Sequence, residues 1–337
     1  MGREPAQGAP RSAVGGGAQR EALTSIGALT ARRNPAGCTC VHSRREGAPV
    51  AGTGVVSMDE SITPRRFVEA FTYDIPKHWL PGNEVVSSLL NAYTVLVPAN
   101  EAFYIRTLNA CLPRITDESL RKRCQAFIRQ EAQHGVAHKR YWDNLDAQGY
   151  AYRGFERIVD RAIFKTMDRW APLWLRASLV SCVEHINAYL GYEFLSQAML
   201  ERADPRVKDL MEWHFAEEIE HRAVAFDLLQ AISPSYPVRL AGAATTAALF
   251  YVLMTGLAVA LLVQDGAFWR RATLRQAAAH LGSNHHMGRR TIGHLWDYLR
   301  PGFHPSQLGG DGLAAAVLAR QATAHPPVVV AMAAKAE

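Results

Sequence analysis

Glu218-Ile219-Glu220-His221 is the stretch that decides the fold, together with Glu131-Ala132-Gln133-His134 earlier in the chain. In each stretch a glutamate and a histidine lie three residues apart, so both side chains fall on one face of an α-helix. Carboxylates and imidazoles are common ligands of transition metals. Glu101 precedes Glu131 by 30 residues and Glu184 precedes Glu218 by 34, so each motif has a further glutamate at a similar distance. The pattern predicts a dinuclear metal site inside a four-helix bundle.

Either motif alone is weak evidence, because a helical bundle with surface glutamate and histidine shows the same spacing. Together they favour the metal site, since the offsets match and apolar residues mark the same helix faces as core. Those apolar residues are Phe127, Ile128, Leu179 and Val180. We therefore expect an all-α fold, in which two antiparallel helical hairpins each supply one glutamate and one Glu-x-x-His.

Capping and breaking residues give the bounds of the first hairpin. Its first helix is expected to begin near Asn83 and to end at Pro113, with Pro98 kinking or splitting it just before Glu101. The second begins at Thr116-Asp117-Glu118, runs to about Leu145 and closes at Gly149. The short link makes these two helices antiparallel neighbours.

Fifty residues separate His134 from Glu184, which is the length of a crossover and includes a short helix over Phe155 to Met167. The third helix is expected from about Pro172 to Leu200. Asp204-Pro205 starts the fourth, with aspartate as N-cap and proline at the first helical position, and Ser233-Pro234 ends it.

Residues 240–263 form an uncharged run of 24 residues that begins at Leu240 and ends at Val263. As a helix the run would span about 36 Å, enough to cross a hydrocarbon core. Its many alanines, threonines and glycines leave two readings open: a membrane-spanning or membrane-embedded helix, or an apolar helix packed on the bundle or at a dimer interface.

The remaining composition sets the domain plan. Residues 1–57 carry seven arginines, no lysine and three glutamates in a Gly- and Pro-rich background, which predicts a disordered extension, and Met58 is a candidate true start. Residues 58–235 are expected to form the metal-binding bundle, 236–308 the hydrophobic helix with a further helical segment, and 309–337 a disordered tail.

Charge and cysteine content limit the cellular setting. Of the net charge of +6, the first 57 residues hold +4, so nothing in the folded part indicates nucleic-acid binding. Five cysteines, three of them in helical patterns, indicate a reducing compartment. We therefore expect a cytoplasmic protein, attached to the inner face of the membrane through Leu240 to Val263 if that run is membrane-embedded.

Several motifs resemble a bacterial family known as predicted metal-dependent hydrolases, over roughly Phe67 to Pro305. They are Pro113-Arg114-Ile115-Thr116-Asp117, Gln130-Glu131-Ala132-Gln133-His134, Glu184-His185, Trp213-His214 with Glu217-Glu218-Ile219-Glu220-His221, and Arg300-Pro301-Gly302-Phe303-His304-Pro305. The ligand order also resembles the ferritin-like di-iron and di-manganese carboxylate proteins. That second resemblance implies a ferritin-like bundle with Glu101, Glu131, His134, Glu184, Glu218 and His221 as metal ligands.

Other residues share the metal-facing stripes. His214, one turn before Glu218, gives a His-x-x-x-Glu-x-x-His helix similar to the di-iron arylamine N-oxygenases, whose added histidine is an iron ligand. Ligation by His214 and a hydrogen-bonding role in the surrounding shell both remain open. His138 and Glu217 are expected in that shell, with Glu217 orienting His214 or His221.

Residues off these stripes are expected to stay outside the site. His185 is turned away from Glu184 by about 100°. Glu220 reads as a solvent-facing charge, and His285-His286 and His304 as loop or tail residues.

Two divalent ions would neutralise four inward carboxylates, which are otherwise costly to bury. We expect iron, with manganese and zinc as alternatives, and oxidation of an organic substrate by dioxygen. The family resemblance implies hydrolysis by a metal-activated water instead, and non-enzymatic metal storage is a third reading. The expected partners are a small, lipophilic substrate, an electron-donor protein and a second copy of the chain.

Overall fold

The computed structural model describes residues 62–68, 71–282 and 287–324, and within these ranges the regular elements are helices without any strand. This confirms the all-α prediction. The expectations for residues 1–57, for His285-His286 and for residues 325–337 lie outside the described ranges.

The first hairpin consists of α1 (Glu84–Cys111) and α2 (Glu118–Ala147), joined by the short η2 (Leu112–Arg114). The side chain of Asn83 caps α1 by accepting from the backbone N–H of Val86, and Asp117 caps α2 in the same way. Gly149, with φ of 80°, follows the end of α2. The expected starts and ends of both helices are confirmed.

Pro98 does not split α1, which continues through it. A proline has no N–H for the carbonyl one turn earlier, which here belongs to Thr94. The indole Nε1–H of Trp142 on α2 donates to that carbonyl at 3.0 Å and replaces the missing bond. The second helix of the hairpin thus stabilises the weak point of the first.

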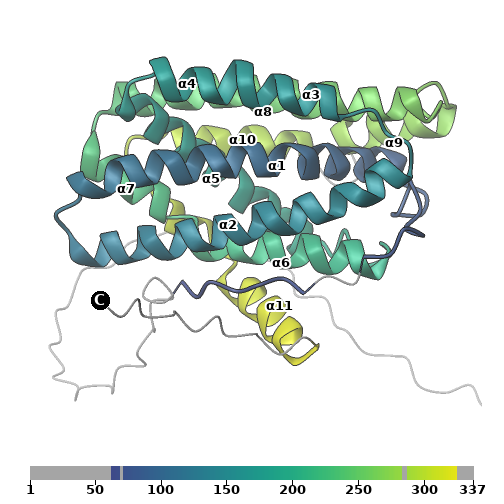
Figure 1. Ribbon diagram of the computed structural model, residues 1–337, viewed down its shortest axis with the longest axis horizontal. Coiled ribbons are helices and arrows are strands. Elements are labelled where there is room, and N and C mark those ends of the chain that lie inside the picture. The colour runs from purple at the N-terminus through teal and green to yellow at the C-terminus, as the bar shows by residue number, and fades with distance from the viewer. Residues whose placement is uncertain (1–61, 69–70, 283–286, 325–337) are drawn as a thin grey trace, which may run out of the picture. The chain divides into compact units, whose positions relative to one another are not determined.

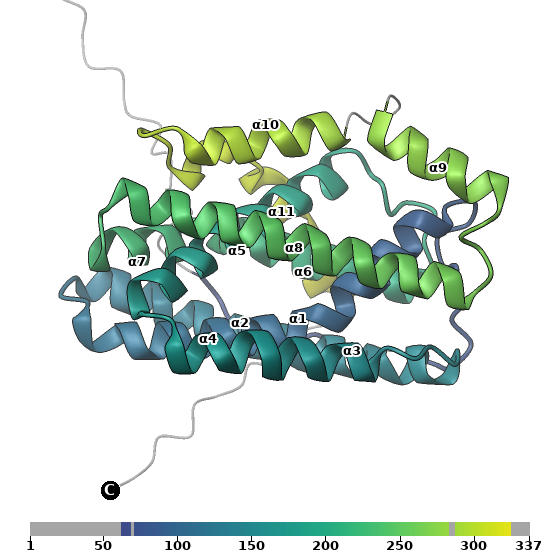
Figure 2. The ribbon, with the colours of Figure 1, turned by 90° about the horizontal axis from the view of Figure 1, so that it is seen from above.

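The crossover is an arm of three consecutive helical segments, α3 (Arg153–Ile158), the π-helical η3 (Val159–Phe164) and α4 (Lys165–Trp170). This arm extends the short helix that the sequence predicts for this region. It runs alongside α1, as the view from above shows (Figure 2).

The second hairpin consists of α5 (Leu173–Ser196) and α6 (Pro205–His221). They approach closely at Gly191, where a Cβ would lie 2.6 Å from the Phe215 carbonyl oxygen. Asp204 caps α6 and Pro205 is its first residue, as predicted. Figure 1 shows the four helices of the two hairpins side by side.

The fourth helix does not run unbroken to Ser233, contrary to the prediction. It stops at His221 and resumes as α7 (Val224–Ile232). The guanidinium of Arg222 donates to the Ile219 carbonyl at 2.6 Å, which occupies the acceptor that the N–H of Ala223 would use in a continuous helix. The break therefore follows directly after the last residue of the Glu-x-x-His motif.

The apolar run forms α8 (Tyr236–Gln264), which packs against α1 and α5. Gly242 makes the close approach to α5 possible, because a Cβ there would collide with Ser178. Within the described ranges α8 alone is long and apolar enough to cross a membrane, and a third of its most apolar window is buried in the protein. One side of α8 is thus packed on the bundle, as one of the two sequence readings requires, and the other side of α8 is exposed.

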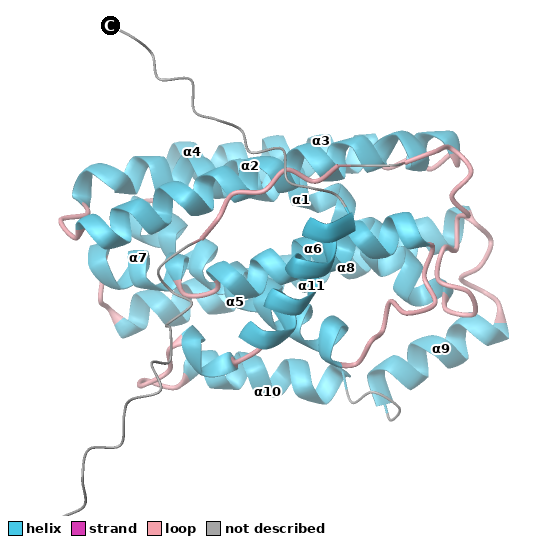
Figure 3. Ribbon diagram, turned by 90° about the horizontal axis from the view of Figure 1, so that it is seen from below, coloured by secondary structure: helices cyan, strands magenta, loops and turns pink. Residues whose placement is uncertain are grey.

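The chain continues through α9 (Arg271–Gly282), α10 (Met287–Leu299) and η4 (Pro305–Leu308) to α11 (Asp311–Ala324). The sequence indicated a disordered tail from 309 onward, and α11 corrects this for residues 311–324. Its Ala314, Val317 and Leu318 are buried, and its Asp311 pairs with Arg222 at 2.7 Å. Figure 3 shows α11 lying across α6. The Ala-rich composition of this segment gave no clear helical pattern, although three apolar residues on one face pack α11 onto α6.

Candidate metal centre

The residues named from the two motifs converge in the middle of the bundle. Four helices contribute them: α1 holds Glu101, α2 holds Glu131 and His134, α5 holds Glu184, and α6 holds His214, Glu218 and His221. All seven side chains are buried. The helical spacing that selected them therefore does bring them together.

The seven residues fall into two groups of four that share Glu218. The Glu101 group comprises Glu101, His134, His214 and Glu218, and the Glu131 group comprises Glu131, Glu184, Glu218 and His221. Within each group, one potential ligand atom from every residue lies within 4.8 Å of the others. Two such groups joined by one carboxylate are the arrangement that a dinuclear centre needs.

Unpaired buried oxygens provide a first test of whether a metal fits. Both carboxylate oxygens of Glu101 and Glu131, and one each of Glu184 and Glu218, are buried without a hydrogen-bond partner in the described part of the protein. Leaving buried carboxylate oxygens unpaired is costly in an ordinary core. Divalent cations would satisfy all of them, so these residues fit two metal ions.

The histidine tautomers provide a second test. The Gln130 amide N–H₂ donates to the Thr63 carbonyl and to Glu220, which leaves the Gln130 carbonyl oxygen as an acceptor 3.1 Å from His221 Nδ1. His221 must donate through Nδ1, so in its neutral form the Nε2 lone pair faces the carboxylates, at 3.0 Å from Glu218. This arrangement is typical of a metal-binding histidine.

His134 shows the same arrangement with the two ring nitrogens exchanged. Its Nε2 lies 3.0 Å from an oxygen of Glu217, to which it donates. Its Nδ1 has no hydrogen-bond partner among the described residues and lies 3.5 Å from Glu101. The neutral ring thus presents the Nδ1 lone pair to the Glu101 group.

The carboxylates resist ionisation without a metal. Burial raises the pKa of Glu101 to about 8, against the effect of His134, and burial with the charge of Glu218 raises that of Glu184 to about 7. Burial and repulsion from four neighbouring glutamates raise the pKa of Glu131 well above its usual value. Glu218 differs: burial acts in the same direction, but two histidines hold its pKa well below the usual range.

The histidines divide in the same way. Burial opposes the imidazolium form, but the adjacent carboxylates outweigh it and raise the pKa of His134 to about 10 and that of His221 to about 9. Burial and the charge of His134 lower the pKa of His214 to about 4. His214 is therefore a neutral ligand-type imidazole near pH 7, whereas the other two hold protons that a metal ion would displace.

His214 lies inside the cluster, with Nε2 at 3.0 Å from Glu218 and 2.6 Å from the Tyr93 hydroxyl. Its Nδ1 lies 3.2 Å from Nε2 of His138, whose other nitrogen contacts Thr94. His138 therefore occupies the surrounding shell, as the sequence predicts. His214 has the position of a ligand in the Glu101 group.

Glu217 orients His134 rather than His214 or His221, which corrects the predicted partner. Glu220 is also misassigned as a solvent-facing charge, because its side chain is only 8% exposed. Arg65 joins the two glutamates, at 3.1 Å from Glu217 and 2.8 Å from Glu220. Arg65 belongs to residues 62–68, a segment hereafter called the strap, which the Gln130–Thr63 bond also fastens to α2.

His185 and His304 were predicted to stay outside the site, and both do so. His185 Nε2 donates to the carbonyl of His294, and His304 pairs with Asp227 at 2.9 Å.

Sequence reasoning missed four contributors: Tyr93, Arg65, Gln130 and the ring of Trp213, which meets His134 edge-on at 4.8 Å. Gln130 and Trp213 lie within the quoted motifs, next to predicted ligands, so their sequence positions could have indicated a role. Arg65 had none, since its partners lie about 150 residues away.

The helical bundle and its buried carboxylates and imidazoles define the class: an all-helical protein built around a dinuclear arrangement of metal-ligand side chains. Residues 63–309 match the family model described as "Predicted metal-dependent hydrolase". The match covers well over half of the chain, so the protein belongs to that family. Comparison with curated proteins and with solved structures finds no significant match.

Proposed function

We propose that the protein is a ferritin-like dinuclear metalloenzyme. The observation that carries the proposal is the pair of ligand groups sharing Glu218, with unpaired carboxylate oxygens in both. In this proposal Glu101, His134 and His214 hold one ion, Glu131, Glu184 and His221 hold the other, and Glu218 contacts both. Bound ions would supply Lewis acidity and, if they are iron, redox chemistry with dioxygen.

The chain's own residues set the conditions for that chemistry. Gln130 and Glu217 keep two histidines in the metal-facing tautomer. Tyr93 extends from the cluster into an apolar cavity and places a hydroxyl at the boundary. The strap binds Glu217, the partner of His134, and the ring of Trp213 packs on His134. The seven candidate ligands are buried away from bulk water.

These surroundings favour oxidation of a lipophilic substrate, because an apolar, water-poor site protects a strong oxidant and suits a substrate without charge. Iron is the metal that we propose for this reaction. Insertion of one oxygen atom from dioxygen, with the other reduced to water, takes two electrons from outside, and a reductase protein would supply them.

The family match favours the second candidate, hydrolysis, more directly than it favours oxidation. In that reaction two zinc or manganese ions would lower the pKa of a bound water to near neutrality. The ligand set suits either reaction, so the reaction class must be measured.

One experiment separates the candidates. The protein is prepared without oxygen, its metals are counted, and oxygen consumption by the ferrous form is followed with and without lipophilic substrates. Two irons with substrate-dependent oxygen uptake support oxidation. Two zinc or manganese ions with ester or phosphoester turnover and no oxygen uptake support hydrolysis.

Variants test the centre itself. Glu218→Ala should lose both ions, because Glu218 belongs to both groups, whereas Glu118→Ala, on an exposed turn of α2, should retain them. Full metal content in Glu218→Ala would refute the assignment.

A further inference from the structure

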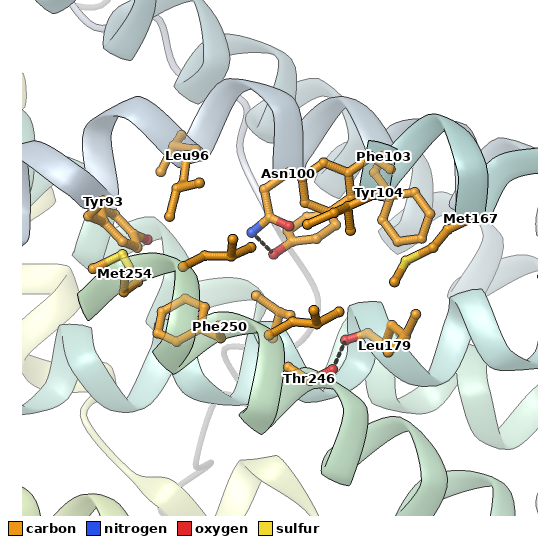
Figure 4. Close-up of a pocket in the computed structure, with 16 residues that line it drawn as sticks. Tyr93, Leu96, Asn100, Phe103, Tyr104, Met167, Leu179, Thr246, Phe250 and Met254 are labelled. Carbon is orange, nitrogen blue, oxygen red and sulfur yellow. Dashed lines mark hydrogen bonds between the residues drawn. The ribbon is translucent and has the colours of Figure 1, made fainter. Parts of the chain in front are cut away.

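A cavity lies beside the cluster, between α1, the η3–α4 arm, α5 and α8 (Figure 4). Its lining is apolar apart from a few groups that already have partners. The Asn100 amide donates to the Tyr104 hydroxyl at 2.6 Å, and the Thr246 hydroxyl donates to the Leu179 carbonyl. An occupant therefore meets hydrocarbon walls and few unpaired polar atoms.

The burial of the lining residues locates the mouth of the cavity. Ile163, Phe164 and Met167 on the arm are half-buried, and so are Leu249, Phe250 and Leu253 on α8. The lining residues on α1 and α5 are nearly all buried. The cavity therefore opens between the arm and α8.

One end of the cavity reaches the candidate metal centre. Tyr93 lines the cavity, and its hydroxyl lies 2.6 Å from His214. Along α1 the lining extends from Tyr93 to Tyr104, about 16 Å at the helical rise per residue. Figure 4 shows Tyr93 at one end and Met167 at the other. The space is a slot that is longer than one small molecule needs.

We propose that this slot binds an unbranched hydrocarbon chain of the substrate, with the end of the chain that reacts lying at Tyr93. The reaction at the end of the chain rests on the proposed function, whereas binding of the chain in the slot does not. It narrows the substrate class to fatty acids, alcohols, aldehydes or related alkyl compounds.

The test is binding of a fluorescent polyene fatty acid, cis-parinaric acid, to the metal-free full-length chain. Leu253→Trp fills the slot from α8. Val252→Trp adds the same bulk one residue earlier, where the side chain is 69% exposed and points away. Leu253→Trp should weaken binding about tenfold or more, the loss expected when roughly two methylene groups are excluded. Val252→Trp should bind within about twofold of the parent.

A matched pair on the arm covers failure of the first variant to fold: Met167→Trp fills the slot from the other rim, and Thr166→Trp is its exposed neighbour. Absence of saturable binding by the parent chain, or equal binding by filled and control variants, would overturn the proposal. Metal content, measured on the same samples, tests the dinuclear centre separately.

A second surface lies on α8, α9, α10 and the link between α8 and α9. Large apolar side chains are exposed on these segments: Val252, Val263, Trp269, Leu274, Ile292 and Trp296, the two tryptophans at 76% and 70%. Figure 2 shows α10 and α9 following one another along one edge of the molecule, beside α8. Residues 265–300 also contain six arginines against two aspartates.

Exposed tryptophan beside arginine suits the interface of an anionic bilayer, where the indole lies at headgroup depth and each cation adds about 1 kcal/mol. We infer that this surface docks on a membrane containing anionic lipid. The docking brings the mouth of the slot, formed in part by α8, close to a source of hydrocarbon chains. It requires no spanning helix, since one side of α8 is packed on α1 and α5.

Co-sedimentation with vesicles tests the docking, with phosphatidylglycerol mixed into phosphatidylcholine and with phosphatidylcholine alone. The parent should sediment with the anionic vesicles, and less so as salt rises. Replacing Trp269 and Trp296 by Ser should weaken this binding about tenfold, while Val136→Ser on α2 should leave it unchanged. No binding to anionic vesicles would overturn the inference. So would equal binding by the double variant, which would assign the affinity to the basic residues 1–57.

Discussion

Replacing Glu131 by Gln should stabilise the metal-free protein and weaken its stabilisation by metal. Glu131 is fully buried, both of its oxygens lack a hydrogen-bond partner in the described part of the chain, and four other glutamates repel its charge. Burial and this repulsion raise its pKa well above the usual 4.5, so the folded state holds the proton more tightly than the unfolded state does.

The pH dependence and its sign follow from that difference. A carboxyl with a raised pKa in the folded state costs nothing below pH 4.5 and about 1.4 kcal/mol more for each pH unit above it, until the folded pKa is reached. The cost at pH 7 is at most about 3 kcal/mol, and at pH 5 it is under about 1 kcal/mol. Glutamine has the same shape without the titration, so Glu131→Gln should gain up to about 3 kcal/mol at pH 7 and under about 1 kcal/mol at pH 5.

Chemical unfolding with chelator at both pH values measures this gain. Adding metal at a thousandfold its dissociation constant should reverse the order, because it stabilises the parent by about 4.1 kcal/mol, which exceeds the gain of the variant, and the variant loses one ligand group. Glu118→Gln on the same helix should change neither value. A loss of stability in chelator, or an equal metal response in parent and variant, would refute the reasoning that Glu131 is a metal ligand.

Three further predictions concern the supports of the site. Gly242→Ala should lower the melting temperature by several degrees, because its Cβ would collide with α5, whereas Gly256→Ala, with open space around it, should not. Arg65→Gln should cost about 2 kcal/mol in chemical unfolding, since it removes the guanidinium that bridges Glu217 and Glu220; Arg65→Lys should recover part of this cost. Asp311→Ala should release α11 from α6, and limited proteolysis with mass spectrometry should then show faster cleavage around this helix.

The sequence predicts most of the four-helix core because each hairpin carries its own signals. Asn83, Asp117 and Asp204-Pro205 begin helices where the structure begins them. The sequence also predicts which residues face the metal centre, since a helix places residues three or four positions apart on one face. Helix caps and helical spacing both depend on residues that are close in the sequence, so they can be recognised without knowing the tertiary contacts.

The misassigned features depend on contacts between distant segments. Arg222 ends α6 by bonding a carbonyl three residues back, while Asp311 and the Pro305 carbonyl hold its guanidinium from the other side. Pro98 leaves α1 intact because Trp142 supplies a donor. Glu220 is covered because the strap crosses α6. None of these partners can be chosen from sequence spacing, since any exposed arginine or tryptophan would fit the pattern equally well.

The cluster has one other physical explanation, a buried network of ion pairs in which protonated histidines balance the glutamates. The unpaired oxygens argue against it. His221 and His134 donate outward through Nδ1 and Nε2 respectively, so each ring has one nitrogen fixed from outside the cluster. The inner nitrogen of His221 contacts Glu218 at 3.0 Å, as it would in an ion-pair network, but a complete network would leave few carboxylate oxygens without a hydrogen bond. Among the described residues, six carboxylate oxygens in the cluster lack one, in both ligand groups, which is the arrangement that cations would complete.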